Sequence, residues 1–334
     1  MSTFVDRHRS DFNFNNNGSL GSFGDILWRD HAGHNVLWLM NNNTAGIIAP
    51  LPAVPPDWHV KAAADFDSVG SGNADILWQN DNGAVVLWQM NAHTVSAIRS
   101  LPNPGPAWHV VGDNNFDSGS SSADILFRND NGSLAIWTMV DDGGGVPTVA
   151  GTFAGIQNPG PTWHVVGTGD THGLGVAGIL WQHDNGALAL WEDPALFNVP
   201  SAGSFFTFTT VAALPAVDAS WQVKGMQDVN DDGRADIIFQ NDNGAVVVWQ
   251  MGGAAGTTIE FTNLVNLNPG PSWHIVGLRD MDNDARIDIL FQNDNGAAAV
   301  WEDYTNLGGG SATFNTVLSI NPNANPNGDI WDLL

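Results

Sequence analysis

The chain has 334 residues, 43% of them hydrophobic, which is enough for two ordinary domains or one large repeat domain with a packed core. Its formal net charge at pH 7 is -25, because 35 Asp and Glu residues stand against only 10 Lys and Arg residues. This acidity argues against a nucleic-acid ligand, whose phosphates require basic side chains. The absence of cysteine excludes disulfides, thiolate metal sites and a cysteine nucleophile.

Three series of aromatic residues divide the chain into six copies of one unit. The first series is Trp58, Trp108, Trp163, Trp221, Trp273 and Trp331, with intervals of 50, 55, 58, 52 and 58 residues. The second is Trp28, Trp78, Phe127, Trp181, Phe239 and Phe291, and the third is Trp38, Trp88, Trp137, Trp191, Trp249 and Trp301. We therefore expect one domain over residues 1–334, with repeats at about 10–60, 61–110, 111–165, 166–223, 224–275 and 276–334.

Each unit predicts four short strands in chain order. A β-branched run such as WHVVG at 108–112 comes first, and a polar loop separates it from a second run such as ADILF at 123–127. The Asn-Asp-Asn-Gly that follows is typical of a tight hairpin turn, because Asn-Gly accepts a positive φ. AVVVWQM at 245–251 represents the third strand, and the Thr- and Val-rich segment 257–267 represents a looser fourth strand. Asn-Pro-Gly-Pro then ends the ladder and turns the chain into the next unit.

Four antiparallel strands in about 50 residues, repeated six times, predict an all-β fold, a six-bladed β-propeller of four-stranded antiparallel blades. Stacked blades bury both faces of most strands, which explains the 15 Trp residues. The N-terminal segment 4–12 is a seventh candidate for a first strand, so a seven-bladed ring is the alternative. We favour closure of the ring by the C-terminal segment 329–334, because Trp331 keeps the pattern whereas the N-terminal segment carries four charged or titratable residues in a row.

Two loops between the first and second strands have the ligand spacing of a calcium site. Calcium takes six to eight oxygen ligands, and alternate positions of a tight loop converge on one point. The expected ligands are Asp228, Asn230, Asp232, Asp236 and the carbonyl of Arg234 in one loop, and Asp280, Asp282, Asp284, Asp288 and the carbonyl of Arg286 in the next. Gly233 relieves the turn in the first loop, and Ala285 replaces it in the second. The alternative is a solvated acidic turn.

The corresponding loops of three other units depart from this spacing. The loop from Asp65 is two residues longer, the loop from Asn115 is one residue longer and lacks the first carboxylate, and the loop from Asp170 ends in Gly178. We expect no calcium in these three loops, and hence one or two calcium ions in all.

The string Asp-x-Asp/Asn-x-Asp-Gly-x-x-Asp, followed by an ILW or IIF strand, resembles the FG-GAP/VCBS repeats. The resemblance covers about residues 10–334 and is strongest at 224–300. It implies a β-propeller like those of integrin α chains and of many bacterial surface and secreted proteins, with calcium held in loops and a ligand or partner bound by the propeller. Some bacterial members of this kind are carbohydrate-binding modules or lectins.

Strand order alone places the loops. Loops after the first and third strands share one face of a propeller, so the Asn-Asp-Asn-Gly turns and the Pro-Gly loops share the other. That face repeats amides, carboxylates and Trp, which suit sugars because planar polar groups pair with adjacent hydroxyls and Trp packs on a pyranose ring. The residues expected to bind carbohydrate are Gln79, Asp81, Asn82, Trp108, Arg128, Asp130, Asn131, Trp163, Gln182, Asp184, Asn185, Trp221, Gln240, Asp242, Asn243, Trp273, Gln292, Asp294, Asn295 and Trp331.

Structural explanations compete with this hypothesis at each position. Asn-Asp-Asn-Gly is first of all turn chemistry, the Trp residues suit the core between blades, and His59, His109, His164 and His274 suit hydrogen-bonded structural roles. Uniform polar residues in every unit nevertheless favour a repeated shallow site, since weak single contacts become strong on a multivalent glycan.

We therefore expect a non-enzymatic, multivalent carbohydrate-binding lectin, with an integrin-like protein-interaction or adhesion module as the alternative and a hydrolase as a third. No Gly-x-Ser-x-Gly elbow, His-Glu-x-x-His helix or phosphate loop stands out. The expected partners are glycans or glycoconjugates, or further copies of the chain, but not nucleic acid or the membrane interior. We expect a secreted or cell-surface location; the chain shows no signal peptide, so cytoplasmic production or another export route is the alternative.

Overall fold

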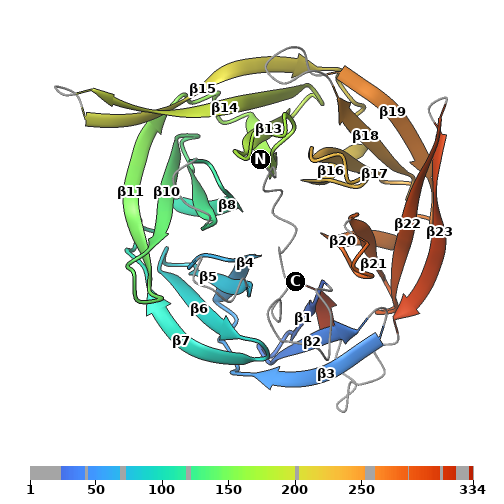
Figure 1. Ribbon diagram of the computed structural model, residues 1–334, viewed down its shortest axis with the longest axis horizontal. Helices are drawn as coiled ribbons and strands as arrows, with labels where there is room; N and C mark the ends of the chain where they lie inside the picture. The colour runs from blue at the N-terminus through green and yellow to red at the C-terminus, as the bar shows by residue number, and fades with distance from the viewer. Residues whose placement is uncertain are drawn as a thin grey trace.

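The computed structural model describes residues 24–41, 44–67, 73–117, 122–199, 203–252, 260–284, 286–308, 311–320 and 331–333. These residues form six four-stranded antiparallel sheets arranged as blades around a central axis, and they contain no helix (Figure 1). In blades two to six the four strands follow one another outward from the axis in chain order. The predicted all-β propeller of four-stranded blades is confirmed.

The strand bounds follow the repeat. Blade one contains β24 (Trp331–Leu333), β1 (Ile26–Asp30), β2 (Asn35–Asn41) and β3 (Thr44–Leu51), and blade two contains β4 (Trp58–Ala64), β5 (Asp75–Asn80), β6 (Val85–Asn91) and β7 (Thr94–Ser100). Blade three contains β8 (Trp108–Asn114), β9 (Asp124–Asn129), β10 (Leu134–Asp141) and β11 (Pro147–Ile156), and blade four contains β12 (Trp163–Gly169), β13 (Gly178–His183), β14 (Leu188–Val199) and β15 (Gly203–Leu214). Blade five contains β16 (Trp221–Gln227), β17 (Asp236–Asn241), β18 (Val246–Gly252) and β19 (Glu260–Leu267), and blade six contains β20 (Trp273–Arg279), β21 (Asp288–Asn293), β22 (Ala298–Gly308) and β23 (Ser311–Ile320).

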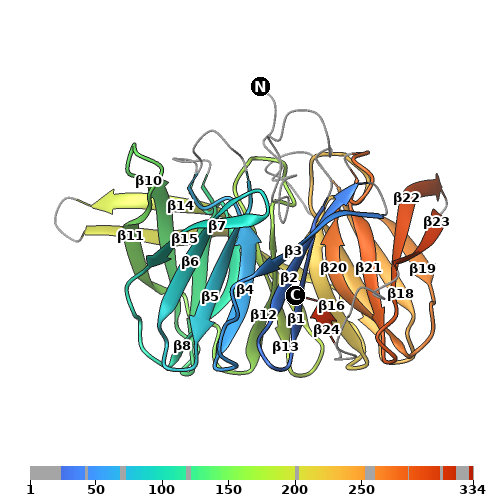
Figure 2. The ribbon, with the colours of Figure 1, turned by 90° about the horizontal axis from the view of Figure 1, so that it is seen from below.

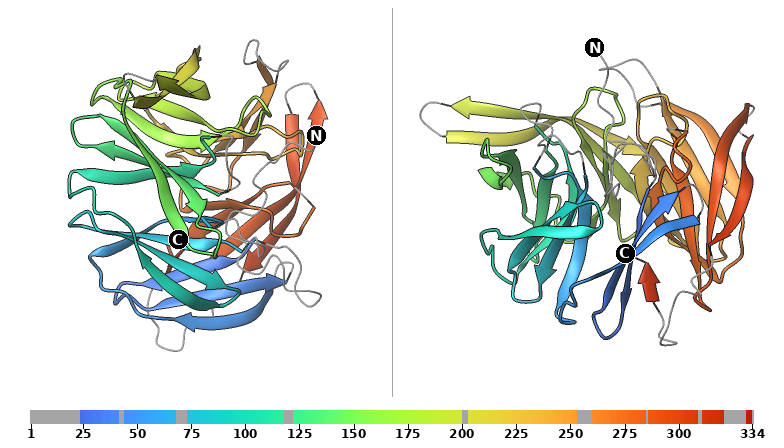
Figure 3. Two further views of the ribbon diagram at one scale, coloured as in Figure 1. Left: turned by 60° about the vertical axis from the view of Figure 1, so that its left-hand side comes forward. Right: turned by 60° about the horizontal axis from the view of Figure 1, so that its bottom comes forward.

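The C-terminal strand closes the ring, as predicted. β24 pairs antiparallel with β1, and the register places Trp331 opposite Asp30. The N-terminal segment 4–12, on which the seven-bladed alternative rests, lies outside the described residues, as does Ala285. The β14–β15 hairpin is long and extends past the rim of the ring (Figure 3).

The core lies between blades. Six buried clusters each combine residues of two neighbouring blades, and the one that contains Ile26, Trp28, Leu290 and Val300 joins blade six to blade one. Within each blade the second-series aromatic lies against the third-series Trp, with ring centroids 4.5–5.1 Å apart. Each buried large apolar side chain contributes about 1.5–3 kcal/mol, so a single blade, with both faces of its sheet exposed, would lose much of this stabilisation.

The two faces of the ring carry different loops. In Figure 2 the inner strand β4 points upward, so the loops after the inner strands lie on the upper side and the hairpin turns between the second and third strands lie on the lower side. We call these the metal-loop face and the turn face. Among the described residues, no helix has the length and apolar character needed to cross a membrane.

Candidate functional site

The turn face is built from tight hairpins packed against the loops that join the blades. In blade two the main-chain N–H of Ala84 donates to Asn82 Oδ1 at 2.9 Å, and Gly83 has a φ of +89°. A Cβ on Gly83 would lie 2.2 Å from the carbonyl carbon of Gly105, in the Pro-Gly loop leading to blade three. Glycine is therefore required by both backbone angle and space, and the predicted proximity of turn and Pro-Gly loop is confirmed.

Asn residues of the turns serve first as turn acceptors. The equivalents of Asn82 accept the main-chain N–H two residues later at 2.9–3.0 Å, and they are Asn131, Asn185, Asn243 and Asn295. This bond occupies Oδ1 in each case. The side-chain NH₂ group of an Asn has two further donors, which is the part of the residue that can face a ligand.

Each Asp of the hairpin turns in blades two to six pairs with the residue that follows the inner-strand Trp of its own blade. In four blades a His Nε2 lies 2.7–2.8 Å from an Asp Oδ1; the pairs are His59–Asp81, His109–Asp130, His164–Asp184 and His274–Asp294. In blade five, Gln222 Nε2 takes the place of the His and donates to Asp242 Oδ1 at 3.3 Å. The His side chains are 49–53% exposed, so these five pairs form a half-exposed polar ring on the turn face.

The Gln residues that precede the turns link neighbouring blades. Gln79 Nε2 donates to the Trp108 carbonyl at 2.8 Å, and its Oε1 accepts the Val110 N–H at 2.9 Å. Gln240 makes the same two contacts to the Trp273 carbonyl and the Ile275 N–H, at 2.7 and 2.9 Å. Both side chains are almost fully buried, so the sequence pattern that suggested a sugar contact at these two positions reports, in the structure, a bridge between blades.

Three other members of this position also bond to a neighbouring blade or to the loop that leads to it. Gln182 Nε2 donates to the Trp221 carbonyl at 3.2 Å, and Arg128 donates to the Gly160 carbonyl at 3.1 Å. Arg29 of blade one, which the sequence did not single out, donates to the carbonyls of Trp58, Val54 and Pro55. Gln292 occupies the equivalent position in β21.

The Trp residues of the first series are partly buried. Five of them pack against the clusters between blades while the residue stays partly exposed: Trp58, Trp108, Trp163, Trp221 and Trp273. They therefore combine the core role with a surface that a ligand can reach. For Trp331 the structure gives the main-chain position in β24.

One pocket of about 150 Å³ opens on the turn face between blades five and six. It is lined by Gln222, Lys224, Gln240, Asn241, Asp242, Pro271, Trp273 and His274. Three of the predicted sugar contacts, Gln240, Asp242 and Trp273, lie together here, with Asp242 at the tip of a hairpin and Trp273 at the start of β20.

On the metal-loop face, the loop from Asp228 buries its first and last predicted ligands, Asp228 and Asp236, whereas Asp232 is exposed. Its three carboxylate side chains do not all lie within 4.8 Å of one another. Asp236 Oδ1 accepts the Met251 N–H at 2.8 Å, and Asp228 Oδ2 accepts the Gly233 N–H at 2.8 Å. Burial raises the pKa of Asp228 and raises that of Asp236 well above its usual range, and neighbouring carboxylates add to both shifts. A divalent cation would relieve this repulsion, so the donor set fits calcium.

In the loop from Asp280, carboxylate oxygens of Asp280, Asp282 and Asp288 lie within 4.8 Å of one another. Burial raises the pKa of Asp288 to about 9, and nearby carboxylates contribute. Asp284, predicted as a ligand, instead lies 3.3 Å from the guanidinium of Arg286. Three of the four predicted side-chain ligands therefore converge here.

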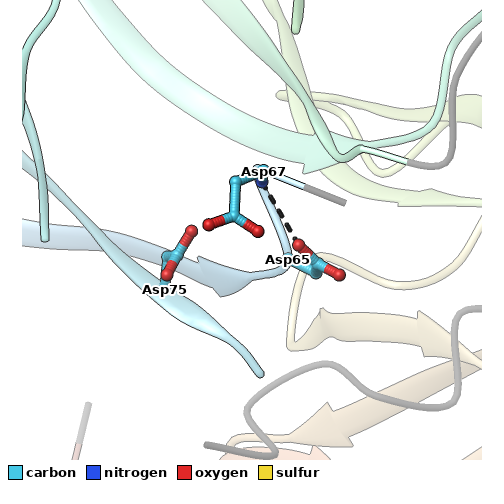
Figure 4. A group of neighbouring side chains, drawn as sticks. All are labelled: Asp65, Asp67 and Asp75. Atoms are coloured by element: carbon cyan, nitrogen blue, oxygen red, sulfur yellow. Dashed lines mark hydrogen bonds between the residues drawn. The ribbon is translucent and has the colours of Figure 1, made fainter. Parts of the chain in front are cut away.

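The loop from Asp65 contains a cluster that the sequence did not predict. Asp65, Asp67 and Asp75 place carboxylate oxygens within 4.8 Å of one another (Figure 4). Asp75 is buried at the start of β5, and burial together with Asp67 raises its pKa well above the usual range. The two-residue insertion counted against this loop does not separate its first and last carboxylates, and the Asp before an ILW strand was the signal that could have revealed the cluster.

The loop from Asp170 replaces carboxylate ligands with a His–Glu contact. Position three is His172, whose Nε2 lies 2.7 Å from Glu192 Oε2. A Cβ on Gly178, which stands at position nine, would lie 3.1 Å from Glu192 Cγ, so the Glu side chain occupies the space that an Asp would need. Burial, then Asp193 and Asp170, raise the pKa of Glu192 to about 8. The expectation that this loop lacks a calcium ligand set agrees with this geometry.

The loops of this face are also linked around the ring. The carbonyl of the first loop residue accepts an N–H from the next blade: Asp65 from Ala123, Asn115 from Ala177, Asp170 from Ala235, Asp228 from Ile287 and Asp280 from Gly24, at 2.5–3.2 Å. A cation that orders one loop would therefore also steady the edge of its neighbour.

The ring of four-stranded antiparallel sheets makes this protein a β-propeller. Residues 228–291, which include both predicted calcium loops, match the family model of the FG-GAP-like repeat, so the chain is a propeller with an FG-GAP-like repeat. No curated protein matches the chain in sequence.

Two of the solved structures that match the chain are the following. A chain in "Crystal Structure of Mitotic Checkpoint Complex" is 10% identical with a TM-score of 0.44, and the match covers 90% of this chain and 78% of that one. A chain in "Structure of Dos1 propeller" is 12% identical with a TM-score of 0.41, and the match covers 83% of this chain and 64% of that one.

Proposed function

We propose that this propeller is a non-enzymatic, multivalent carbohydrate-binding protein whose sites lie on the turn face. The observation that carries the proposal is the ring of five half-exposed His–Asp or Gln–Asp pairs, each near a partly exposed Trp. Each carboxylate has about four acceptor positions and uses one on its partner, so the rest can accept sugar hydroxyls. Neighbouring Asn NH₂ groups add donors, and the indole surface suits the apolar face of a pyranose.

Repetition favours binding over catalysis. The polar pairs recur at equivalent places in five blades, whereas a catalytic centre needs one group of residues with distinct roles. Repeated weak sites gain avidity on a glycan that presents many copies of a sugar. Chromogenic glycosides test this part of the proposal: turnover that survives purification would favour a hydrolase instead.

The calcium ions belong to the opposite face in this proposal. The loops at 228–236 and 280–288 would hold one or two ions that stiffen the ring, and the fit rests on the buried carboxylates whose pKa values are raised. The ions would act on the sugar sites only through the stability of the blades.

A glycan array is the direct test of sugar binding. We expect binding to one or more simple sugars, with strong reduction in an Asp242→Ala/Asn243→Ala variant. Asp142→Ala provides the matched control, because Asp142 is an exposed acidic turn residue in the loop between β10 and β11, on the metal-loop face. Absence of sugar binding in saturating calcium would contradict the proposal.

A protein-interaction module is the second candidate, and it has observations of its own. A propeller with an FG-GAP-like repeat supports this class of function. The outer strands also expose aliphatic side chains, namely Ile48, Ile98, Val211 and Val317, each opposite a third-series Trp in the register. If the array is negative, cross-linking in a native extract with these four residues changed to Thr would test this alternative.

The proposed function also leads to proposals about the partners and the location of the protein. We propose glycans or glycoconjugates as partners, with homo-oligomers as a way to raise valency, and neither nucleic acid nor the membrane interior as a ligand. A secreted or surface location follows from a glycan partner. Fractionation of the source cells followed by immunoblotting would test it.

A further inference from the structure

The sequence contains two lysines, and both occupy the same place in the repeat. Lys61 and Lys224 are the third residues after the inner-strand Trp of blades two and five. In blades three, four and six this place holds Val111, Val166 and Val276. In a chain of net charge -25, a lysine at this position makes blade five chemically different from its neighbours.

This position is the extra residue of a β-bulge. In blade five the register passes from Val223 opposite Phe239 to Gly225 opposite Ile238, which leaves Lys224 without a cross-strand partner. Bulges redirect side chains and are common next to binding sites. Here the bulge coincides with the pocket between blades five and six, which Lys224 lines.

The ammonium of Lys224 belongs to a short polar chain inside that pocket. Lys224 Nζ donates to Gln222 Oε1 at 3.1 Å, and Gln222 Nε2 donates to Asp242 Oδ1 at 3.3 Å. An ammonium has three N–H donors, so this bond leaves donors for a ligand. Burial lowers the pKa of Lys224 and Asp242 opposes that shift, as expected for a cation that has lost part of its water.

The charge of this pocket differs from that of the pairs in blades three, four and six. There the lysine position holds valine, so no lysine offsets the Asp of the pair, whereas in blade two Lys61 offsets Asp81. In blade five, Lys224 offsets Asp242, so an anionic ligand meets one negative charge fewer at the contact. Trp273 and Pro271 supply an apolar wall beside these polar groups.

We propose that the pocket between blades five and six binds a monosaccharide that carries a carboxylate, such as a hexuronic acid. This rests on the carbohydrate-binding function proposed above and gives one of its sites a ligand class. Lys224 pairs with the sugar carboxylate, Asp242 and Gln222 meet ring hydroxyls, and the apolar wall faces the pyranose ring. The pocket volume of about 150 Å³ suits a single sugar residue.

The test compares D-glucuronate with D-glucuronamide in an NMR titration of the full chain. The two sugars share their hydroxyls, and the amide removes only the charge. We expect D-glucuronate to bind at least about tenfold more tightly, since an ionic hydrogen bond is lost with the amide. Lys224→Met should abolish that preference, and Lys224→Arg should restore much of it. Lys61→Met is the matched control, because Lys61 occupies the same bulge position in another blade and is exposed there.

Each outcome decides the matter. Equal binding of the two sugars, a preference that survives Lys224→Met, or a preference lost equally in Lys61→Met would overturn the assignment. A melting temperature within the normal range for each variant shows that the fold is retained. If neutral sugars bind on the array but D-glucuronate does not, only this inference fails; if D-glucuronate alone binds, the multivalent neutral-sugar function fails while this site stands.

Discussion

The clearest prediction concerns Gln240, whose role as a bridge between blades can be separated from a role in binding. Its amide joins two main-chain groups, the part-buried Trp273 carbonyl at 2.7 Å and the buried Ile275 N–H at 2.9 Å. Gln240→Met keeps the length of the side chain but offers neither a donor to the carbonyl nor an acceptor to the N–H. A buried polar group left unsatisfied costs about 1–3 kcal/mol, and water can reach the part-buried carbonyl, so the variant should lose about 1–3 kcal/mol of unfolding free energy.

Urea denaturation followed by Trp fluorescence measures this loss. Gln222→Met is the control: Gln222 is exposed and its bond to Asp242 is 3.3 Å long, so the change should stay within about 0.5 kcal/mol. If Gln240→Met unfolds at the same urea concentration as the native chain yet loses sugar binding, Gln240 serves the ligand, and the reasoning from its two contacts is refuted.

Three further predictions concern metal, pH and ring closure. Chelation should lower the melting temperature, because removal of calcium present at a hundred times its Kd costs about 2.7 kcal/mol of unfolding free energy. Asp288→Asn should reduce the drop in melting temperature, and an unchanged melting temperature after chelation would exclude bound calcium. Because the pKa of Glu192 is raised from 4.5 to about 8, the stability tied to its proton is complete below pH 4.5 and lost as pH rises through about 8. In excess calcium, Glu192→Gln should therefore reduce the decline in unfolding free energy between pH 6 and 9 by about 2–3 kcal/mol, and parallel curves of the two proteins would contradict this. A chain ending at Gly328 lacks β24 and should not unfold cooperatively; a melt like that of the full chain would show that β24 does not close the ring.

The fold could be predicted because its information is periodic. Three aromatic series recur in all six units, the Asn-Gly turns recur in five and the Pro-Gly loops recur at three junctions, and each corresponds to one strand or turn of a blade. Ring closure was predictable for the same reason, since Trp331 continues the first series. Local chemistry was enough wherever a residue acts within its own repeat.

The site was harder to predict because several side chains act on a different strand or blade. Gln79 and Gln240 look like surface amides in their own repeats, and only the placement of the next blade shows what they bind. Glu192 lies in β14, yet it fills the space left at the end of the Asp170 loop. The Asp65 cluster was missed because the longer spacing along the chain suggested that its carboxylates would lie apart, whereas Asp65, Asp67 and Asp75 converge.

These contacts divide the repeated turn-face residues into two groups with different consequences. Gly83, Gln79, Gly244 and Gln240 are fixed by packing between blades, so their recurrence needs no ligand to explain it. The exposed Asp of each turn is different, because its pairing with the inner-strand His or Gln leaves acceptor capacity open to solvent. Lys224 is different again, because the bulge that holds it tolerates valine in three other blades. A search for function on this propeller should therefore begin with groups that the fold does not require, and two of them, Asp242 and Lys224, line the pocket between blades five and six.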